Sequence, residues 1–155
     1  MEKIIIINDK EFKQCAIFDR VYASKDGWVV TVHKNGQKGE PTKGHGNMDS
    51  GGKKLKEPNA MIFDAPCKPY SKNGKIFYTK KTNVGQLILL AWIGTIEEAG
   101  KDEWGNPRET VDHINRVPSD NRLENLRWAS FKEQARNRRK PVRHVHNDFE
   151  QFMEA

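Results

Sequence analysis

The segment VDHINR at residues 111–116 places an acid and a histidine side by side, Asp112 and His113. An imidazole group titrates near pH 6.5, so it can take a proton from water at cellular pH. A histidine used in this way needs a partner that holds its ring. Asn125 could accept a hydrogen bond from the ring nitrogen that does not face the water. Taken alone, a histidine in a strand is more often structural, and Asn125 could be an ordinary turn residue.

The same segment suggests a metal site. Successive side chains project from opposite sides of a strand, so Asp112 could face a cation if the strand bends toward the helix that follows. Gln134 and Asn137 are three residues apart and share one face of that helix, so either amide oxygen could complete the site. One carboxylate and one amide favour Mg²⁺ or Mn²⁺ over zinc. Both amides could equally face solvent on a polar helix.

Positive charge is concentrated directly after VDHIN. Residues 116–143 contain nine Lys/Arg and three Asp/Glu, whereas residues 1–115 contain 18 and 15, within a chain of net charge +6. Arginine suits phosphate because its planar group donates two parallel hydrogen bonds; a solvated basic helix face is the alternative. If this charge binds phosphate, the contacts are expected from Arg116, Arg122, Arg127, Arg136, Arg138, Arg139 and Lys140.

The elements that would position these residues follow the order strand, loop, strand, helix across residues 110–140. ETVDHI and LRWAS read as the two strands, with one helical turn at NRLEN between them. Ser130 and Glu133 form a capping box, so a helix should begin there and run to about Lys140, where Pro141 stops it. Trp128 is expected to fill the core beneath this ββα unit.

Turn signals upstream predict small antiparallel hairpins. One surrounds Ser24–Gly27 and the other surrounds Ser71–Gly74, which contains Asn-Gly. The four isoleucines at 4–7 predict a short buried strand. The apolar segment NVGQLILLAWIG predicts a buried core helix, capped by Asn83 and ended by Gly94.

Two segments offer little to bury. Residues 35–59 are rich in Gly and Lys and predict a long mobile loop, and residues 95–109 predict a polar connector. The mean hydropathy of −0.86 also indicates a small hydrophobic core.

No apolar run approaches the roughly 18–20 residues of a membrane span. Cys15 and Cys67 lack CxxC spacing, so neither a zinc finger nor a disulfide scaffold is indicated. A cytoplasmic protein without a membrane partner is expected.

The segment VDHINRVPSDNRLENLRWASFKEQARNRR resembles the HNH endonuclease motif, in the form found in phage-borne and homing-type nucleases. DHI, the Asn-Arg pair at 121–122, ENLRW and EQARNR occur in order at the family spacing. The resemblance implies an α+β fold with a ββα-metal unit and a metal-dependent endonuclease acting on double-stranded DNA. It implies His113 as general base, Asp112 as metal ligand, Asn125 as the residue that orients the base, and a helix amide as second ligand.

Two positions depart from the family pattern. Gly85-Gln86 stands where the family helix usually carries His-Arg, and Gln134 stands where Asn or His is common. Glutamine is one methylene longer, so Asn137 is kept as the competing ligand.

The expected organisation has three parts. Residues 1–94 form an N-terminal hairpin region with a core helix, which would supply any sequence specificity together with the loop at 35–59. Residues 95–141 form the nuclease unit, and residues 142–155 form a flexible acidic tail. The oligomeric state is open, with a monomer favoured. The alternative functions are a non-catalytic nucleic-acid-binding protein and a phage accessory protein with a relict HNH scaffold.

Overall fold

A computed structural model describes residues 3–138 of the chain. The fold is a mixed α+β fold with antiparallel sheets, and the predicted strand–strand–helix unit lies near its C-terminal end. The elements are β1 (Ile4–Ile7), β2 (Lys10–Gln14), β3 (Val21–Ala23), β4 (Val29–Thr31), β5 (His45–Gly46), β6 (Met61–Lys72), β7 (Lys75–Asn83), α1 (Val84–Trp92), α2 (Ile96–Ala99), β8 (Thr110–His113), η1 (Leu123–Asn125), β9 (Leu126–Ala129) and α3 (Phe131–Arg136).

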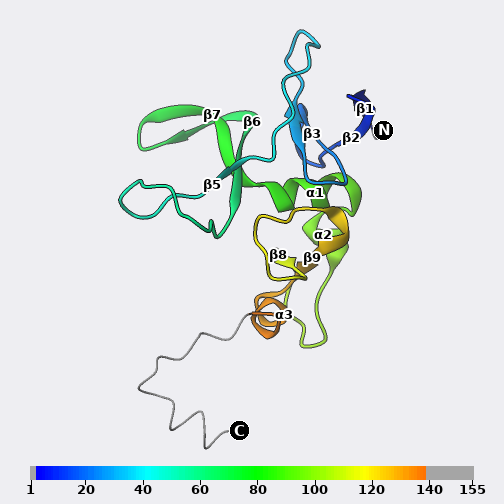
Figure 1. Ribbon diagram of the computed structural model, residues 1–155, viewed down its shortest axis with the longest axis vertical. Coiled ribbons are helices and arrows are strands. Elements are labelled where there is room, and N and C mark those ends of the chain that lie inside the picture. The colour runs from blue at the N-terminus through cyan, green and yellow to red at the C-terminus, as the bar shows by residue number, and fades with distance from the viewer. Residues whose placement is uncertain (1–2, 139–155) are drawn as a thin grey trace, which may run out of the picture.

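Three sheets surround the helix α1. The strand orders are β1-β2-β3-β4, β5-β6-β7 and β8-β9, with every pairing antiparallel. In Figure 1 α1 lies at the centre, between the N-terminal sheet and the β8-β9 pair, while the β6–β7 hairpin projects to one side. The helix α1 is therefore the element that joins the N-terminal part to the C-terminal unit.

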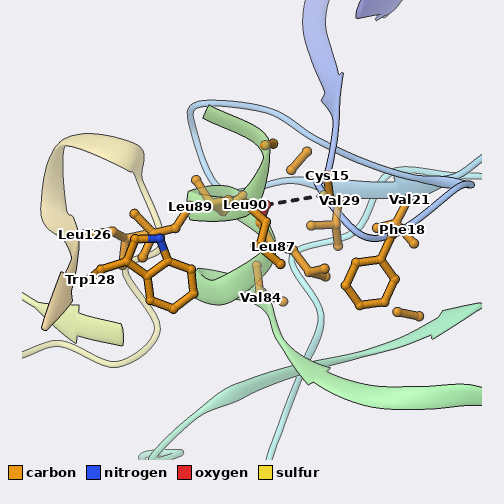
Figure 2. Packing of buried hydrophobic residues seen from close by; sticks show 14 residues of the cluster. Cys15, Phe18, Val21, Val29, Val84, Leu87, Leu89, Leu90, Leu126 and Trp128 are labelled. Atoms are coloured by element: carbon orange, nitrogen blue, oxygen red, sulfur yellow. Dashed lines mark hydrogen bonds between the residues drawn. The ribbon is translucent and has the colours of Figure 1, made fainter. Parts of the chain in front are cut away.

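One hydrophobic cluster is centred on α1. Leu87, Ile88 and Leu89 are fully buried, and the cluster includes residues of β3 and β4 on one side and of β9 on the other. Figure 2 shows Leu126 and Trp128 packed beside α1. The expectation that Trp128 belongs to the core is confirmed: it is 7% exposed, and its Nε1 donates to the Gly94 carbonyl at 2.9 Å.

The local turn and helix signals are confirmed. The turn at Ser24–Gly27 joins β3 to β4, and the Asn73-Gly74 turn, with φ values of 51° and 74°, joins β6 to β7. The predicted core helix is α1, although Asn83 makes no side-chain capping hydrogen bond. The prediction of a buried N-terminal strand is half wrong. The segment β1 is a strand, but it is an edge strand with Ile4 52% and Ile6 62% exposed, because it pairs only with β2.

The segment at 35–59 is more structured than predicted. It contains β5 and isolated bridges that pair Thr42 with Val29 and Lys38 with Val32. The side-chain oxygen of Asn47 accepts hydrogen bonds from the backbone N–H groups of residues 59 and 60. These hydrogen bonds order a segment that has few apolar side chains to bury. The connector at 95–109 also contains an unpredicted helix, α2, with a capping box between Thr95 and Glu98.

The C-terminal unit has the predicted order of elements. The capping box of Ser130 and Glu133 begins α3 as expected. The helix ends at Arg136 rather than near Lys140, because Asn137 is its C-cap and its side chain is bonded to β8. Lys140 and Pro141, like the predicted acidic tail, lie outside the described residues.

Two simpler expectations concern the membrane and the cysteines. Within residues 3–138 no helix is long and apolar enough to cross a membrane. Cys15 and Cys67 are free cysteines. Cys15 is buried in the core, and this burial raises the pKa of its thiol well above the ordinary value.

Candidate active site

The antiparallel pair β8-β9 carries the two candidate chemical groups. Asp112 lies opposite Arg127 in the register, and His113 lies opposite Leu126. Leu126 and Trp128 are buried in the core, so β9 is fixed there and holds β8 through the strand pairing. The acid and the histidine are therefore carried by a strand at the surface of the core rather than by a free loop.

His113 is held through its ring nitrogen by Asn121. The Nε2 atom lies 2.7 Å from Oδ1 of Asn121, and Asn121 is only 6% exposed. An amide oxygen can only accept, so Nε2 carries the proton and Nδ1 of the neutral ring keeps its lone pair. A Cβ atom added at Gly85 would lie 2.9 Å from this oxygen, and one at Gly27 would lie 3.3 Å from the Asn121 backbone. Two glycines of the N-terminal part thus make room for the residue that holds the histidine.

Asn125 does not hold the ring, and this expectation is corrected. Its Oδ1 accepts from the Asn115 backbone N–H at 2.8 Å, and its Nδ2 donates to Oδ1 of Asn115 and to the Asp120 carbonyl. Asn125 ends the η1 turn, so its side chain points into the loop between the strands and fastens that loop. Asn121 lies in the segment that resembles the HNH motif, but the sequence alone assigns it no role. Only its place in a short loop between the two strands indicates that it can fold back beneath His113.

Asp112 faces Asn137 rather than Gln134. It is 4% exposed, and it accepts from Nε of Arg127 at 2.8 Å and from Nδ2 of Asn137 at 3.2 and 3.4 Å. Gln134 does lie on the same helical face, as predicted, but its Nε2 donates to the Val111 carbonyl at 3.2 Å. The amide beside the carboxylate is therefore Asn137, the residue kept as the competing ligand.

The donors around Asp112 fit a hard divalent cation. Rotating the Asn137 amide by half a turn would place its oxygen beside the Asp112 carboxylate, giving two oxygen ligands at one place. The rotation would break the hydrogen bonds that Nδ2 donates to the carbonyls of His113 and Ile114. Such a sparse set suits Mg²⁺ or Mn²⁺, which retain several waters. Among residues 3–138 no group of three or more His, Cys, Asp or Glu side chains could hold a metal ion, so the ligand set expected of a zinc site is not found there.

The arginines predicted to contact DNA are partly engaged within the protein. Arg122 donates to Asp120 at 2.7 and 2.8 Å and to Glu124 at 2.8 Å. These hydrogen bonds hold the pKa of Asp120 well below its usual range. The positive charge of Arg122 is thus balanced by two acids within the protein, which weakens the case for Arg122 as a phosphate contact.

Other members of the basic group differ in their surroundings. Arg136 lies over the Trp104 ring at 4.3 Å and pairs with Glu103 at 3.3 Å. Arg116 lies at the site itself, with Nε 3.5 Å from Oδ1 of Asn137, and it is exposed. Arg138 is exposed. Arg139 and Lys140 lie outside the described residues.

A polar network fastens the connector to the start of α3, which the sequence did not reveal. The hydroxyl of Ser130 donates to Asp102, and Arg108 pairs with Glu133 at 3.1 Å. Burial alone would raise the pKa of Asp102, but hydrogen bonds from Ser130 and from backbone groups of its own turn lower it. The Ser130 backbone N–H and the guanidinium of Arg108 likewise lower the pKa of Glu133.

Two strands and a short helix thus bring together a histidine, a buried aspartate and an amide. Residues 96–136 match the model of the HNH endonuclease family. The matched segment contains Asp112, His113, Asn121 and Asn125 and ends one residue before Asn137. No match was found among curated proteins or among solved structures.

Proposed function

We propose that the protein is a DNA endonuclease that hydrolyses phosphodiester bonds of double-stranded DNA with a divalent metal ion. The observation that supports this best is the arrangement inside the matched segment. His113 is held by Asn121 through Nε2, while the neighbouring Asp112 faces the amide of Asn137. Binding alone would need no oriented histidine beside a buried acid.

In this proposal His113 is the general base. Its Nδ1 atom takes a proton from the attacking water, and the positive charge that develops on the ring strengthens the hydrogen bond from Nε2–H to Asn121. Asn121 also fixes the ring plane, because its own side chain is buried between the N-terminal part and the loop. Asn125 acts one step further away by fastening the loop that carries Asn121.

Asp112 and Asn137 would hold the metal ion, with Gln134 as the alternative amide. Mg²⁺ or Mn²⁺ bound there would neutralise charge on the phosphate and on the leaving oxygen. Arg116, exposed beside Asn137, would bind a neighbouring phosphate of the same strand.

The test is cleavage of supercoiled plasmid with Mg²⁺, with Mn²⁺ and with EDTA. His113→Ala should lower the cleavage rate about 10²–10⁴-fold, because a positioned base contributes this much, while DNA binding in a gel-shift assay persists. His45→Ala, which changes an exposed histidine of β5, is the matched control and should cut like the wild type.

Two results would refute the proposal. Wild-type protein that binds DNA but cuts with none of these ions would favour a non-catalytic binding protein. Equal rates for His113→Ala and wild type would show that the base is another group.

A further inference from the structure

The β6–β7 hairpin leaves the body of the protein beyond its root. Ala65 and Thr82 at the root are buried, and β5 pairs with β6 only at residues 61 and 62. From residue 68 to residue 81 every side chain is exposed. Figure 1 shows this part of the hairpin projecting sideways from the rest of the fold. Its position is thus set at the root, and its free part is available to a partner.

The free part of the hairpin is strongly basic. The hairpin contains one acid, Asp64, and five lysines: Lys68, Lys72, Lys75, Lys80 and Lys81. Asp64 pairs with Lys81 at 3.7 Å, but both side chains are more than half exposed, so this pair is weak. The hairpin therefore presents a net positive charge to solvent.

Aromatic side chains lie among these lysines. Tyr70 and Phe77 face each other across the two strands, with ring centroids 5.5 Å apart, and each is 38% exposed. Ile76 and Tyr78 are more than 60% exposed. Large apolar groups gathered on an otherwise polar surface indicate a binding site.

The hairpin forms one wall of a wide groove. The groove has a volume of about 1760 Å³, and Lys68, Lys72 and Lys80 line it together with the Tyr70–Phe77 pair. Residues of the loop between β2 and β3 also line the groove, where Asp19 offsets the charge of Arg20, and Lys34 adds a further positive charge. A partner in this groove would thus meet more basic than acidic groups.

The charge and shape of the hairpin indicate which kind of partner it binds. A second copy of the chain would bring two basic hairpins together, which their mutual repulsion opposes. Duplex DNA supplies the complementary charge. Its major groove, about 12 Å wide and 8.5 Å deep, admits a two-stranded β-ribbon. The free ribbon, five residues in β6, extends roughly 16 Å at about 3.3 Å per residue, which exceeds the depth of the groove.

We propose that residues 68–81 form a DNA-binding arm that enters the major groove of duplex DNA, with its lysines on phosphates and its aromatic pair against the bases. This inference rests on the proposed endonuclease function, because it places the contacts that decide where the nuclease unit cuts. Lys72 and Asn73, next to the tip, have side chains able to read the edges of guanine and adenine.

The first test is binding to a 30-base-pair duplex of mixed sequence, measured by fluorescence anisotropy over a range of NaCl concentrations. The triple variant Lys68→Ala, Lys72→Ala, Lys80→Ala should bind about 10–100-fold more weakly at moderate salt. The slope of log affinity against log salt should fall by about 2–3. The control, Lys3→Ala, Lys10→Ala, Lys101→Ala, removes the same charge from exposed positions outside both the hairpin and the loop at 35–59. Equal losses in the two variants would refute the arm.

The second test uses duplex whose cytosines carry glucosylated hydroxymethyl groups, which fill the major groove. Wild-type affinity should fall on this DNA, whereas the arm variant should bind both duplexes alike. Wild-type protein that is indifferent to the glucosyl groups, or that prefers single strands, would overturn the major-groove assignment. Circular dichroism should show the same fold for both triple variants, since the changed residues are exposed.

The two proposals fail separately. Wild-type protein that binds no duplex at all would refute the nuclease function itself. Wild-type protein that binds and cuts, together with an arm variant that binds equally well, would refute the arm alone.

Discussion

The side-chain oxygen of Asn121, Oδ1, determines which ring nitrogen of His113 can accept a proton. This oxygen lies 2.7 Å from Nε2, so Nε2 carries the proton and Nδ1 keeps its lone pair. Asn121→Ala should therefore lower kcat for plasmid cleavage by about 10–100-fold, the usual effect of removing a partner that orients a histidine. DNA affinity and KM should stay close to the wild-type values, because Asn121 is buried and contacts no phosphate in the proposed mechanism. A fall in affinity with unchanged kcat would contradict this role.

Gly85 explains one departure from the family pattern. A side chain at this position would meet Oδ1 of Asn121 at 2.9 Å and Cγ1 of Val111 at 3.0 Å. Alanine normally stabilises a helix by about 1 kcal/mol relative to glycine. Here we expect Gly85→Ala to lower the free energy of unfolding by about 1–3 kcal/mol, the usual cost of overpacking, and to slow cleavage. If the effect on cleavage acts through Asn121, the double variant Gly85→Ala, Asn121→Ala should cleave no more slowly than Asn121→Ala alone. If the losses in cleavage rate of the two single variants add up in the double variant, Gly85→Ala acts by a route other than Asn121.

Sequence reasoning succeeded with residues whose signals are local and failed with those whose partners are distant. The Asn73-Gly74 turn and the Ser130–Glu133 capping box need only their neighbours in the chain, and both were predicted correctly. The pairing of His113 with Asn121 depends on how a loop folds back beneath a strand. Spacing alone favoured Asn125, because the sequence shows which amides are near the motif but not which one the loop turns inward.

At the scale of elements, a network of carboxylates fastens α3 to the connector. The pKa values of Asp102 and Glu133 are lowered in the folded protein. A lowered carboxyl pKa stabilises the fold above the unfolded value near 4, and this stabilisation is lost as the pH falls through the folded value. The free energy of unfolding, measured with urea, should therefore decline between about pH 5 and pH 2.

The variant Asp102→Asn tests the source of this decline. Its unfolding free energy should be lower at pH 7 and should depend less on pH in the acid range, because one of the titrating groups is gone. An acid decline as steep as that of the wild type would place the responsible carboxylates elsewhere. Asp120, whose pKa is lowered by Arg122, would then be the next candidate.

At the scale of the whole molecule, the C-terminal unit formed by β8, β9 and α3 shares one core with the N-terminal part. Leu87 of α1 is fully buried in the cluster that also contains Trp128 of β9. Leu87→Ala should destabilise the protein by about 2–5 kcal/mol and loosen β8 and β9 together with β3 and β4. Hydrogen exchange should show faster exchange in both regions, and fluorescence and circular dichroism should report one common unfolding transition. Separate transitions would show that residues 95–138 unfold independently.

The ion pair between Arg127 and Asp112 bears on whether the ββα unit needs a metal ion in order to fold. The buried carboxylate already has a cationic partner on the facing strand, at 2.8 Å. Zinc fingers, by contrast, stay unfolded until their metal arrives. Here the charge is balanced in advance, so the ββα unit can be completed during folding with no ion present. In the proposed function, an incoming cation would compete with the guanidinium of Arg127 for the same oxygens. Its binding would release Arg127 beside the proposed phosphate position.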